Sequence, residues 1–305
     1  MTRLLVTTGQ GRFEEKQWQR PQCGPREIAV KAVLTGVCRS DIDMMTGGFG
    51  PLPEHMSGHE GLGQVIEVGS EIKHVLVGSY VATRGEPAYA DEYNVRETEF
   101  VPVPSPDPKY ILEPVACGIN LIRQSLDAVW ERTSSVSGPR KRMLILGTGF
   151  LAWVAYNTVL IEKLDFDIDV IGKSKRDVWG DILKEAPVGT YDVIIDLSGS
   201  DVVFSSDTVV YNENALIIMG EQKQVTTNFA NMLWKAVTMV FPSPRNSDFY
   251  TCMIYAEEWI TSGQLTVDKF WTRGYNRDTE WQQAFTDGYD RPDNYSRGYI
   301  KWNQQ

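Results

Sequence analysis

A buried apolar run that leads directly into a glycine-rich turn is the feature that most constrains the fold of this chain. Residues 143–146 read Met-Leu-Ile-Leu, a continuous run typical of a strand buried on both faces of a sheet. A turn with two glycines follows at 147–149, and a helical stretch comes after it. Comparable runs, separated by helix-length segments, recur at 168–171, 193–197, 215–219 and 237–241. This alternation predicts an α/β fold with a doubly wound parallel sheet.

The glycine-rich turn itself predicts a dinucleotide site. Gly147 would permit the tight turn, and Gly149 would let the backbone approach a pyrophosphate. Ala152 stands at the third position of the pattern, where a small residue allows close packing of helix on strand. The phosphates would then lie at a helix N-terminus, whose free N–H groups favour negative charge. The alternative is an ordinary glycine-containing turn.

The residues after the second predicted strand indicate which dinucleotide is bound. An NAD enzyme usually carries an acidic residue there, which binds the ribose hydroxyls. Here the acidic residues fall too early, within or before the strand, and the strand leads into Gly172, Lys173, Ser174, Lys175 and Arg176. Three cations and a hydroxyl could hold a 2′-phosphate through charge-assisted hydrogen bonds, so we expect NADP(H) to be preferred over NAD(H). The alternative is a solvated, charged start of a helix.

The first 110 residues have a different pattern. Short apolar stretches at 27–33, 63–68 and 79–83 are interrupted by glycine and proline, which predicts a β-rich, antiparallel, barrel-like domain. The proline-rich run at 101–108 predicts an extended connector, because proline removes backbone donors. Glu113-Pro114 then opens a helical pattern.

Within this β-rich part, Cys38 is followed by His59 and Glu60. A thiolate, an imidazole and a carboxylate are ligands of catalytic zinc, which keeps one position open for water or substrate. The alternative is a buried structural cysteine and a core histidine. The three residues belong to a longer string: Cys38-Arg39-Ser40-Asp41, then Gly58-His59-Glu60-Gly61-Leu62-Gly63, then Gly69 and Val77-Gly78-Ser79-Tyr80-Val81. That string resembles the zinc-dependent branch of the medium-chain dehydrogenases/reductases, the family of the zinc alcohol, sorbitol and glucose dehydrogenases.

The resemblance implies a domain organisation and a set of zinc ligands. A GroES-like catalytic domain, discontinuous in sequence, would comprise residues 1–118 and 268–305, and a Rossmann domain residues 119–267. Cys38 and His59 would bind one catalytic zinc, with Glu60 as a ligand or close neighbour. Glu113 matches the glutamate of the glucose and sorbitol dehydrogenase branch, which binds the metal directly or holds its water.

The resemblance also implies a path for the substrate proton, and it indicates that the structural zinc of most zinc members is missing. Ser40 would bond the substrate oxygen and pass its proton outward, while Asp41 is expected to be structural. Asp43 stands where many alcohol dehydrogenases have a relay histidine, so this sequence lacks the usual residue for proton exit. His55, nearby in sequence, is a candidate for the relay, and His74 is expected at the surface. The segment 83–93 lacks the closely spaced cysteines that bind a structural zinc in most zinc members, so no structural zinc is expected.

The implied reaction is reversible hydride transfer between NADP(H) and an alcohol, polyol or sugar, or the corresponding aldehyde or ketone. Zinc would act as the Lewis acid, and the small-molecule substrate would lie between the domains. A metal-free quinone or enoyl reductase and a non-catalytic NADPH-binding protein of the same superfamily are the alternatives. A homodimer or homotetramer is expected by resemblance.

Composition narrows the function classes further. The chain has 305 residues, of which 42% are hydrophobic and 23% charged, as is ordinary for a globular protein. The net charge of −10 argues against nucleic acid and anionic membranes as partners. No apolar run suggests a membrane span or an export segment. The four cysteines are widely separated and form no disulfide framework, so we expect a cytoplasmic protein.

Overall fold

The chain divides into two compact units. The computed structural model describes residues 2–7, 9–48, 53, 56–133, 140–173, 176–205, 209–221 and 225–302, with the backbone alone at 131–133 and 176. The first unit comprises residues 1–116 and 253–305, and the second comprises residues 117–252. Both divisions fall within helices, α2 (Glu113–Arg123) and α6 (Phe249–Thr261).

The second boundary lies earlier in the chain than the family resemblance implies, at 252/253 rather than 267/268. The later part of α6 belongs to the first unit, where the Thr261 hydroxyl lies 3.3 Å from the Tyr110 hydroxyl. The first boundary, at 116/117, lies close to the expected 118/119.

The first unit is built on a seven-stranded sheet that is antiparallel apart from one pair. Its strand order is β14-β15-β3-β4-β5-β7, with β6 paired to β3. These strands are β3 (Glu27–Gly36), β4 (Gly61–Val68), β5 (Tyr80–Thr83), β6 (Glu92–Arg96), β7 (Phe100–Val103), β14 (Trp271–Asn276) and β15 (Arg297–Lys301). A separate two-stranded ladder joins β1 (Thr2–Thr7) and β2 (Phe13–Trp18). The sheet confirms the predicted β-rich domain.

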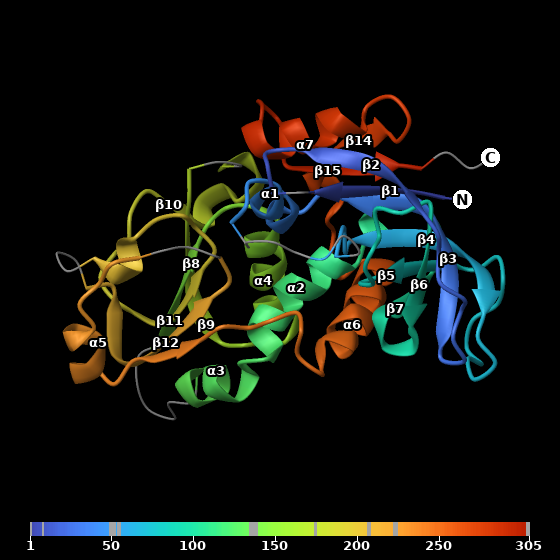
Figure 1. Cartoon of the computed structure of the whole chain (residues 1–305). Coiled ribbons are helices and arrows are strands. Elements are labelled where there is room, and N and C mark those ends of the chain that lie inside the picture. Colours follow the sequence, from blue (N-terminus) through green and yellow to red (C-terminus); the bar gives the residue numbers. More distant parts are fainter. Residues whose placement is uncertain are drawn as a thin grey trace. The chain divides into compact units, whose positions relative to one another are not determined.

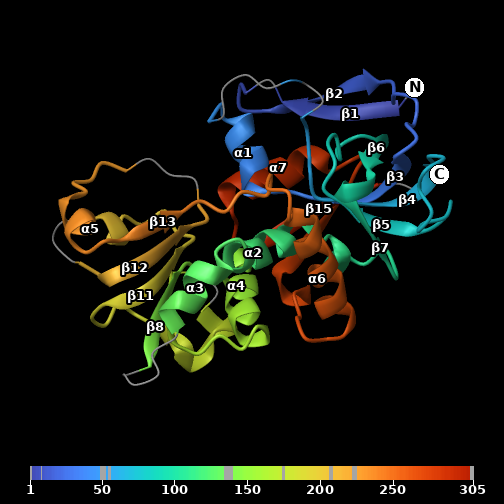
Figure 2. The same ribbon diagram turned by 90° about the horizontal axis from the view of Figure 1, so that it is seen from below.

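Strands from the two ends of the chain meet in this sheet. β15 pairs with β3 in antiparallel register, and β14 pairs with β15 in parallel. Figures 1 and 2 show the C-terminal elements, in red, beside the N-terminal ones, in blue. The helices α1 (Arg39–Met45) and α7 (Trp281–Asp290) contact each other in the same unit. The first unit is therefore discontinuous in sequence.

The proline-rich run at 101–108 differs from the prediction of a plain connector. Its first three residues belong to β7, which ends the strand order of the sheet, and Pro108 opens the 3-10 turn η2 (Pro108–Tyr110). A strand with only one neighbour tolerates proline, because the missing N–H faces away from the ladder.

The second unit is a six-stranded parallel sheet in the order β10-β9-β8-β11-β12-β13. The strands are β8 (Lys141–Leu146), β9 (Phe166–Ile171), β10 (Leu183–Lys184), β11 (Tyr191–Asp196), β12 (Tyr211–Met219) and β13 (Thr238–Val240). In chain order this reads 3-2-1-4-5-6, the Rossmann arrangement, which places ligands at the point where the order reverses. Figure 2 shows β8, β11, β12 and β13 in this sequence. The predicted fold class is confirmed.

The apolar runs of the central strands β8, β11 and β12 are continuous because these strands are covered on both faces. Met143 and Ile145 of β8 pack in one core cluster with Ala155 of α4 (Phe150–Ile161). Leu144 and Leu146, which point the opposite way, pack in a second cluster. Neighbouring side chains of a strand alternate between faces, so two cores require an apolar residue at every position.

The connections between strands are less helical than the spacing predicts. Besides α4, the described part of this unit has α3 (Leu126–Thr133) before the sheet and α5 (Ala230–Trp234) before β13. The segments after β9 and β11 carry 3-10 turns instead: η3 (Arg176–Val178), η4 (Gly180–Ile182) and η5 (Val202–Phe204). Gly180 lies in the first of these segments, where its conformational freedom disfavours a regular helix. In the described parts of the chain, none of the helices has the length and apolar character of a membrane span.

Candidate metal centre and dinucleotide turn

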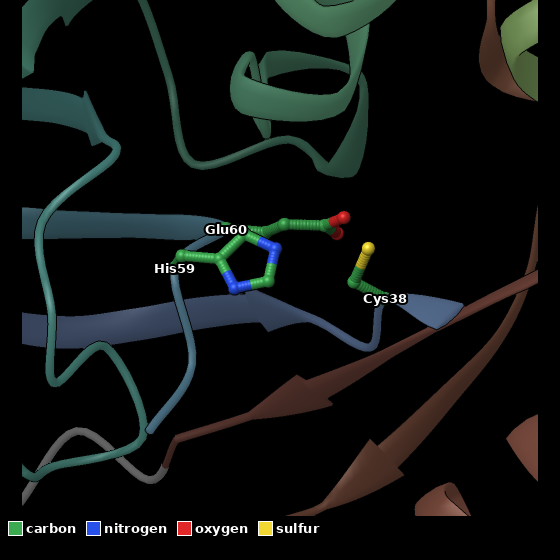
Figure 3. A group of neighbouring side chains, drawn as sticks. All are labelled: Cys38, His59 and Glu60. Atoms are coloured by element: carbon green, nitrogen blue, oxygen red, sulfur yellow. The ribbon is translucent and has the colours of Figure 1, made fainter. Parts of the chain in front are cut away.

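Three potential metal ligands meet where β3 ends and β4 begins. Thr35 of β3 is paired with Gly61 of β4, so the residues just after β3 lie beside those just before β4. Cys38 follows β3, and His59 and Glu60 precede β4. One ligand atom from each residue lies within 4.8 Å of the other two. Figure 3 shows the thiol and the carboxylate on the same side of the imidazole.

Glu60 is fully buried and bound to an arginine from the end of the chain. Nη2 of Arg297, the first residue of β15, donates to both carboxylate oxygens of Glu60 at 2.5 Å. Burial lowers the pKa of Arg297, but the charges of Glu60 and Cys38 outweigh that effect and raise it. The guanidinium also lies 4.9 Å from the Trp271 ring. A carboxylate can accept further bonds, so this pair leaves Glu60 able to approach a metal.

Asp41, in the first turn of α1, faces the Nδ1 side of the His59 ring. Its side chain is completely buried, and Oδ2 accepts hydrogen bonds from the Cys38 N–H at 2.9 Å and from the Tyr89 hydroxyl at 2.7 Å. Oδ1 has no hydrogen-bond partner among the described residues and lies 3.7 Å from Nδ1 of His59. On the other side of the ring, the Ser40 hydroxyl lies 3.5 Å from Nε2.

Negative groups surround the imidazole. Burial raises the pKa of the Cys38 thiol, and the charge of Glu60 adds to this effect. Burial lowers the pKa of His59, but Asp41, Cys38 and Glu113 outweigh it and raise that pKa well above its usual value. The site is therefore one in which a cation at its centre is favoured.

These residues fit a zinc ion. A metal-bound histidine usually donates its second ring N–H to a carboxylate, which fixes the orientation of the ring. The otherwise unused Oδ1 of Asp41 faces Nδ1 of His59, which leaves Nε2 for a metal. Thiolate sulfur and imidazole nitrogen are preferred zinc ligands.

The other residues predicted for this site differ in how close they lie to the three ligands. Glu113 begins α2 and is 3% exposed, and its charge acts on His59, but it lies outside the group of ligand atoms within 4.8 Å. Asp43 forms an ion pair with Arg39 at 3.2 Å, so it is engaged away from His59. His55 lies outside the described residues.

The glycine-rich turn stands at the reversal point of the parallel sheet. Gly147 has a φ of 119°, and a Cβ there would lie 2.9 Å from the carbonyl oxygen of Leu197. Gly149 immediately precedes α4, and Ala152 is 1% exposed against the sheet. The geometry is that of a phosphate-binding turn at a helix N-terminus.

An unforeseen tryptophan supports this turn. Nε1 of Trp179 donates to the carbonyl oxygen of Thr148 at 3.1 Å, and the indole packs against Trp153 of α4. Trp179 follows a 3-10 turn, and no local pattern marks it as part of the site.

The segment expected to select the dinucleotide is described in part. A Cβ at Gly172 would lie 2.5 Å from the Thr148 hydroxyl, so no side chain fits there without a shift of Thr148. Lys173 is exposed. Ser174 and Lys175 lie outside the described residues, and Arg176 is described by its backbone.

The Glu60–Arg297 pair generates a stability prediction. Replacing Arg297 with leucine leaves a buried carboxylate without its cation, so Arg297→Leu should lower the free energy of unfolding by about 3–5 kcal/mol. The matched control is Arg12→Leu, whose ion pair with Glu14 is exposed (69% and 37%). Arg12→Leu should lower the free energy of unfolding by less than about 1 kcal/mol.

Urea denaturation with a chelator present measures both variants. Adding Glu60→Gln to Arg297→Leu should recover part of the loss, because it removes the unpaired charge. Equal midpoints for Arg297→Leu and Arg12→Leu would contradict a stabilising buried pair.

Comparisons with known proteins agree with the fold. Residues 24–104 match the family described as alcohol dehydrogenase GroES-like domain. Sheep sorbitol dehydrogenase is 33% identical over 113 residues, which cover 34% of this chain and 32% of that enzyme. The chain thus spans about a third of the sheep enzyme's length. D-arabitol-phosphate dehydrogenase of Enterococcus avium is 24% identical over 313 residues, covering 87% of each chain.

Solved structures show the same fold. Alcohol dehydrogenase TADH from Thermus sp. ATN1 superimposes with a TM-score of 0.77 at 17% identity, covering 99% of this chain and 100% of that one. Galactitol-1-phosphate dehydrogenase from Escherichia coli gives a TM-score of 0.72 at 16% identity, covering 98% and 99%. Residues 24–104 thus carry a GroES-like domain of the alcohol dehydrogenase type, and with its Rossmann sheet the chain is similar in fold to the medium-chain dehydrogenases/reductases.

Proposed function

We propose that this protein is a zinc-dependent oxidoreductase that transfers a hydride between NADP(H) and an alcohol, polyol or sugar, or the corresponding aldehyde or ketone. The observation that carries the proposal is the meeting of Cys38, His59 and Glu60 within 4.8 Å in a domain of the alcohol dehydrogenase type. The relatives named for sorbitol and D-arabitol phosphate act on polyols, which supports that substrate class.

Bound zinc would supply a Lewis acid for the substrate oxygen, and bound NADP(H) would accept or donate the hydride. The residues of the chain have distinct tasks. Cys38 and His59 hold the metal, and Asp41 orients the imidazole through Nδ1. The Ser40 hydroxyl, beside the ring at 3.5 Å, is placed to accept a hydrogen bond from a substrate hydroxyl.

The charge balance of the site supports this role. A ligand set with Cys38, Glu60 and Glu113 would bring three negative charges, which would weaken the Lewis acidity of zinc. Arg297 offsets the charge of Glu60 through two hydrogen bonds. The remaining thiolate and the Glu113 carboxylate match the charge of a divalent ion, with Glu113 bound directly or through water.

Metal content tests the proposal. The purified protein should hold about one zinc per chain, and Cys38→Ala should lose it, because the thiolate is a strong zinc ligand. Cys23→Ala is the matched control: Cys23 is also half-buried, but its thiol contacts the carbonyl oxygen of Glu27.

Elemental analysis measures both variants, with alcohol oxidation followed in parallel. Absence of zinc from the folded wild-type protein would overturn the proposal in favour of a metal-free reductase. Zinc retained by Cys38→Ala would contradict the assignment of Cys38 as a ligand. Zinc and cofactor binding without turnover of any alcohol or carbonyl would favour a binding protein.

We further propose NADP(H) as the preferred cofactor. Because Gly172 packs against Thr148, a ribose-binding carboxylate is disfavoured at this position. The exposed Lys173 begins the cationic run through Lys175 and Arg176, whose charges suit a 2′-phosphate.

The double variant Lys173→Ala/Lys175→Ala tests that preference. It should raise the dissociation constant for NADPH about tenfold or more while leaving that for NADH unchanged, since charge-assisted bonds to the 2′-phosphate are lost. Lys184→Ala, an exposed lysine of β10 in the same unit, is the control. Fluorescence titration measures both cofactors. Equal catalytic efficiency of the wild-type protein with NAD and NADP would contradict the preference.

We propose that the protein forms a homodimer whose interface includes β13. β13 ends the strand order of the parallel sheet, and large apolar side chains near it are exposed: Phe229 57%, Leu233 79%, Trp234 85% and Phe241 69%. Apolar side chains clustered beside a sheet edge are typical of a surface that a second copy covers.

Leu233→Lys/Trp234→Lys should raise the dissociation constant of this dimer about tenfold or more, because both apolar anchors are lost. Leu76→Lys is the control, since Leu76 is similarly exposed at 75% but lies in the first unit. Sedimentation velocity measures the mass. A monomeric wild-type protein, or a dimer unaffected by the double change, would contradict the interface.

A further inference from the structure

One tyrosine contacts both segments that carry the metal ligands. Tyr89 is completely buried in the core of the first unit, between β5 and β6 in sequence. Its backbone and ring contact the segment before His59, and its hydroxyl contacts the segment around Cys38. No sequence pattern marks it as functional.

The ring of Tyr89 determines the path of the chain before His59. The Tyr89 N–H donates to the carbonyl oxygen of Ser57 at 3.2 Å. Gly58 lies on the ring with a φ of 74°, and a Cβ there would lie 2.6 Å from Cγ of Tyr89. The glycine of the Gly-His-Glu motif is thus required both by its backbone conformation and by the tyrosine beneath it.

The hydroxyl of Tyr89 determines the orientation of Asp41. It lies 2.7 Å from Oδ2 of Asp41 and 3.0 Å from the carbonyl oxygen of Gly36. The Cys38 N–H donates to the same Oδ2 at 2.9 Å. With Oδ2 held from two sides, the carboxylate presents its other oxygen to Nδ1 of His59 at 3.7 Å.

The tyrosine ring is itself held in place. Phe13 packs against it edge-on with ring centres 5.8 Å apart, and Phe285 does so at 5.3 Å. The Leu5 N–H donates to the carbonyl oxygen of Tyr89 at 3.0 Å. Two strands, β1 and β2, and one helix, α7, therefore hold Tyr89 in place relative to both ligand segments.

We propose that Tyr89 is a positioning residue of the metal centre: its hydroxyl orients Asp41, Asp41 orients His59, and the three together raise the affinity for zinc. The inference rests on the proposed zinc function. A histidine whose ring is already oriented loses less freedom when it binds the metal, which is why removal of such supporting groups typically weakens metal binding.

Tyr89→Phe tests the proposal, because it removes the hydroxyl and keeps the ring that packs on Gly58, Phe13 and Phe285. Its matched control is Tyr93→Phe: Tyr93 is also completely buried in this unit, and its hydroxyl lies 2.8 Å from that of Thr83. Both changes remove one buried hydrogen bond, so both should lower the thermal midpoint similarly.

The primary readout is zinc affinity of the full-length protein, measured by competition with a chromogenic chelator. Tyr89→Phe should raise the zinc dissociation constant about tenfold or more, while Tyr93→Phe stays within about twofold of the wild-type value. Visible spectra of the cobalt-substituted proteins give a second readout. The bands of Tyr89→Phe should shift, and those of Tyr93→Phe should match the wild type.

A double-variant cycle separates positioning from general loosening. If Tyr89 acts through Asp41, then Tyr89→Phe should weaken zinc binding little further in an Asp41→Asn background. Wild-type affinity in Tyr89→Phe, an equal loss in Tyr93→Phe, or full additivity with Asp41→Asn would overturn the inference and leave the zinc function standing. Failure of the wild-type protein to bind zinc would overturn both.

Discussion

The site of this protein depends on the antiparallel pairing of β3 with β4. In that ladder Thr35 lies opposite Gly61. Cys38 is therefore close in space to His59 and Glu60, although about twenty residues separate them in sequence. Neither segment needs an unusual backbone beyond Gly58, because the two strands already end and begin at the same place. Ligands placed at strand ends are held by the rigid sheet, which fixes their geometry more precisely than a loop would.

Near this pair of strands, each of the buried carboxylates Glu60 and Asp41 has a cation or hydrogen-bond donors as partners. Glu60 is matched by Arg297, and Asp41 by the Cys38 and Tyr89 donors on one oxygen and the His59 ring near the other. A buried carboxylate without a partner would lower the stability of the folded domain. These partners therefore allow negative groups to lie near the proposed metal position at a smaller cost in folding free energy. The same arrangement lets the site favour a divalent cation.

How far the sequence predicts this molecule depends on whether the signal is local. The strand–turn–helix at Gly147 and the motif at His59 are short patterns, and from them the fold class and the proposed ligands follow. Arg297 and Tyr89 carry no such pattern, since their roles arise only when β15 pairs with β3 and when the Tyr89 ring packs beneath Gly58. The helix-length spacing between strands predicts helices after β9 and β11, whereas the described residues there form 3-10 turns, one of which begins at Gly180.

The position of Arg297 in the chain has a consequence for biosynthesis. The second unit, residues 117–252, is continuous and has all its strands once its own segment leaves the ribosome. The first unit is started earlier but lacks β14 and β15 until residues 271–301 have been made, and with them the cation that neutralises Glu60. Of the two units, the first in sequence is therefore the last to be completed. The Glu60–Arg297 pair of the candidate metal centre can form only after the whole of the second unit has been synthesised.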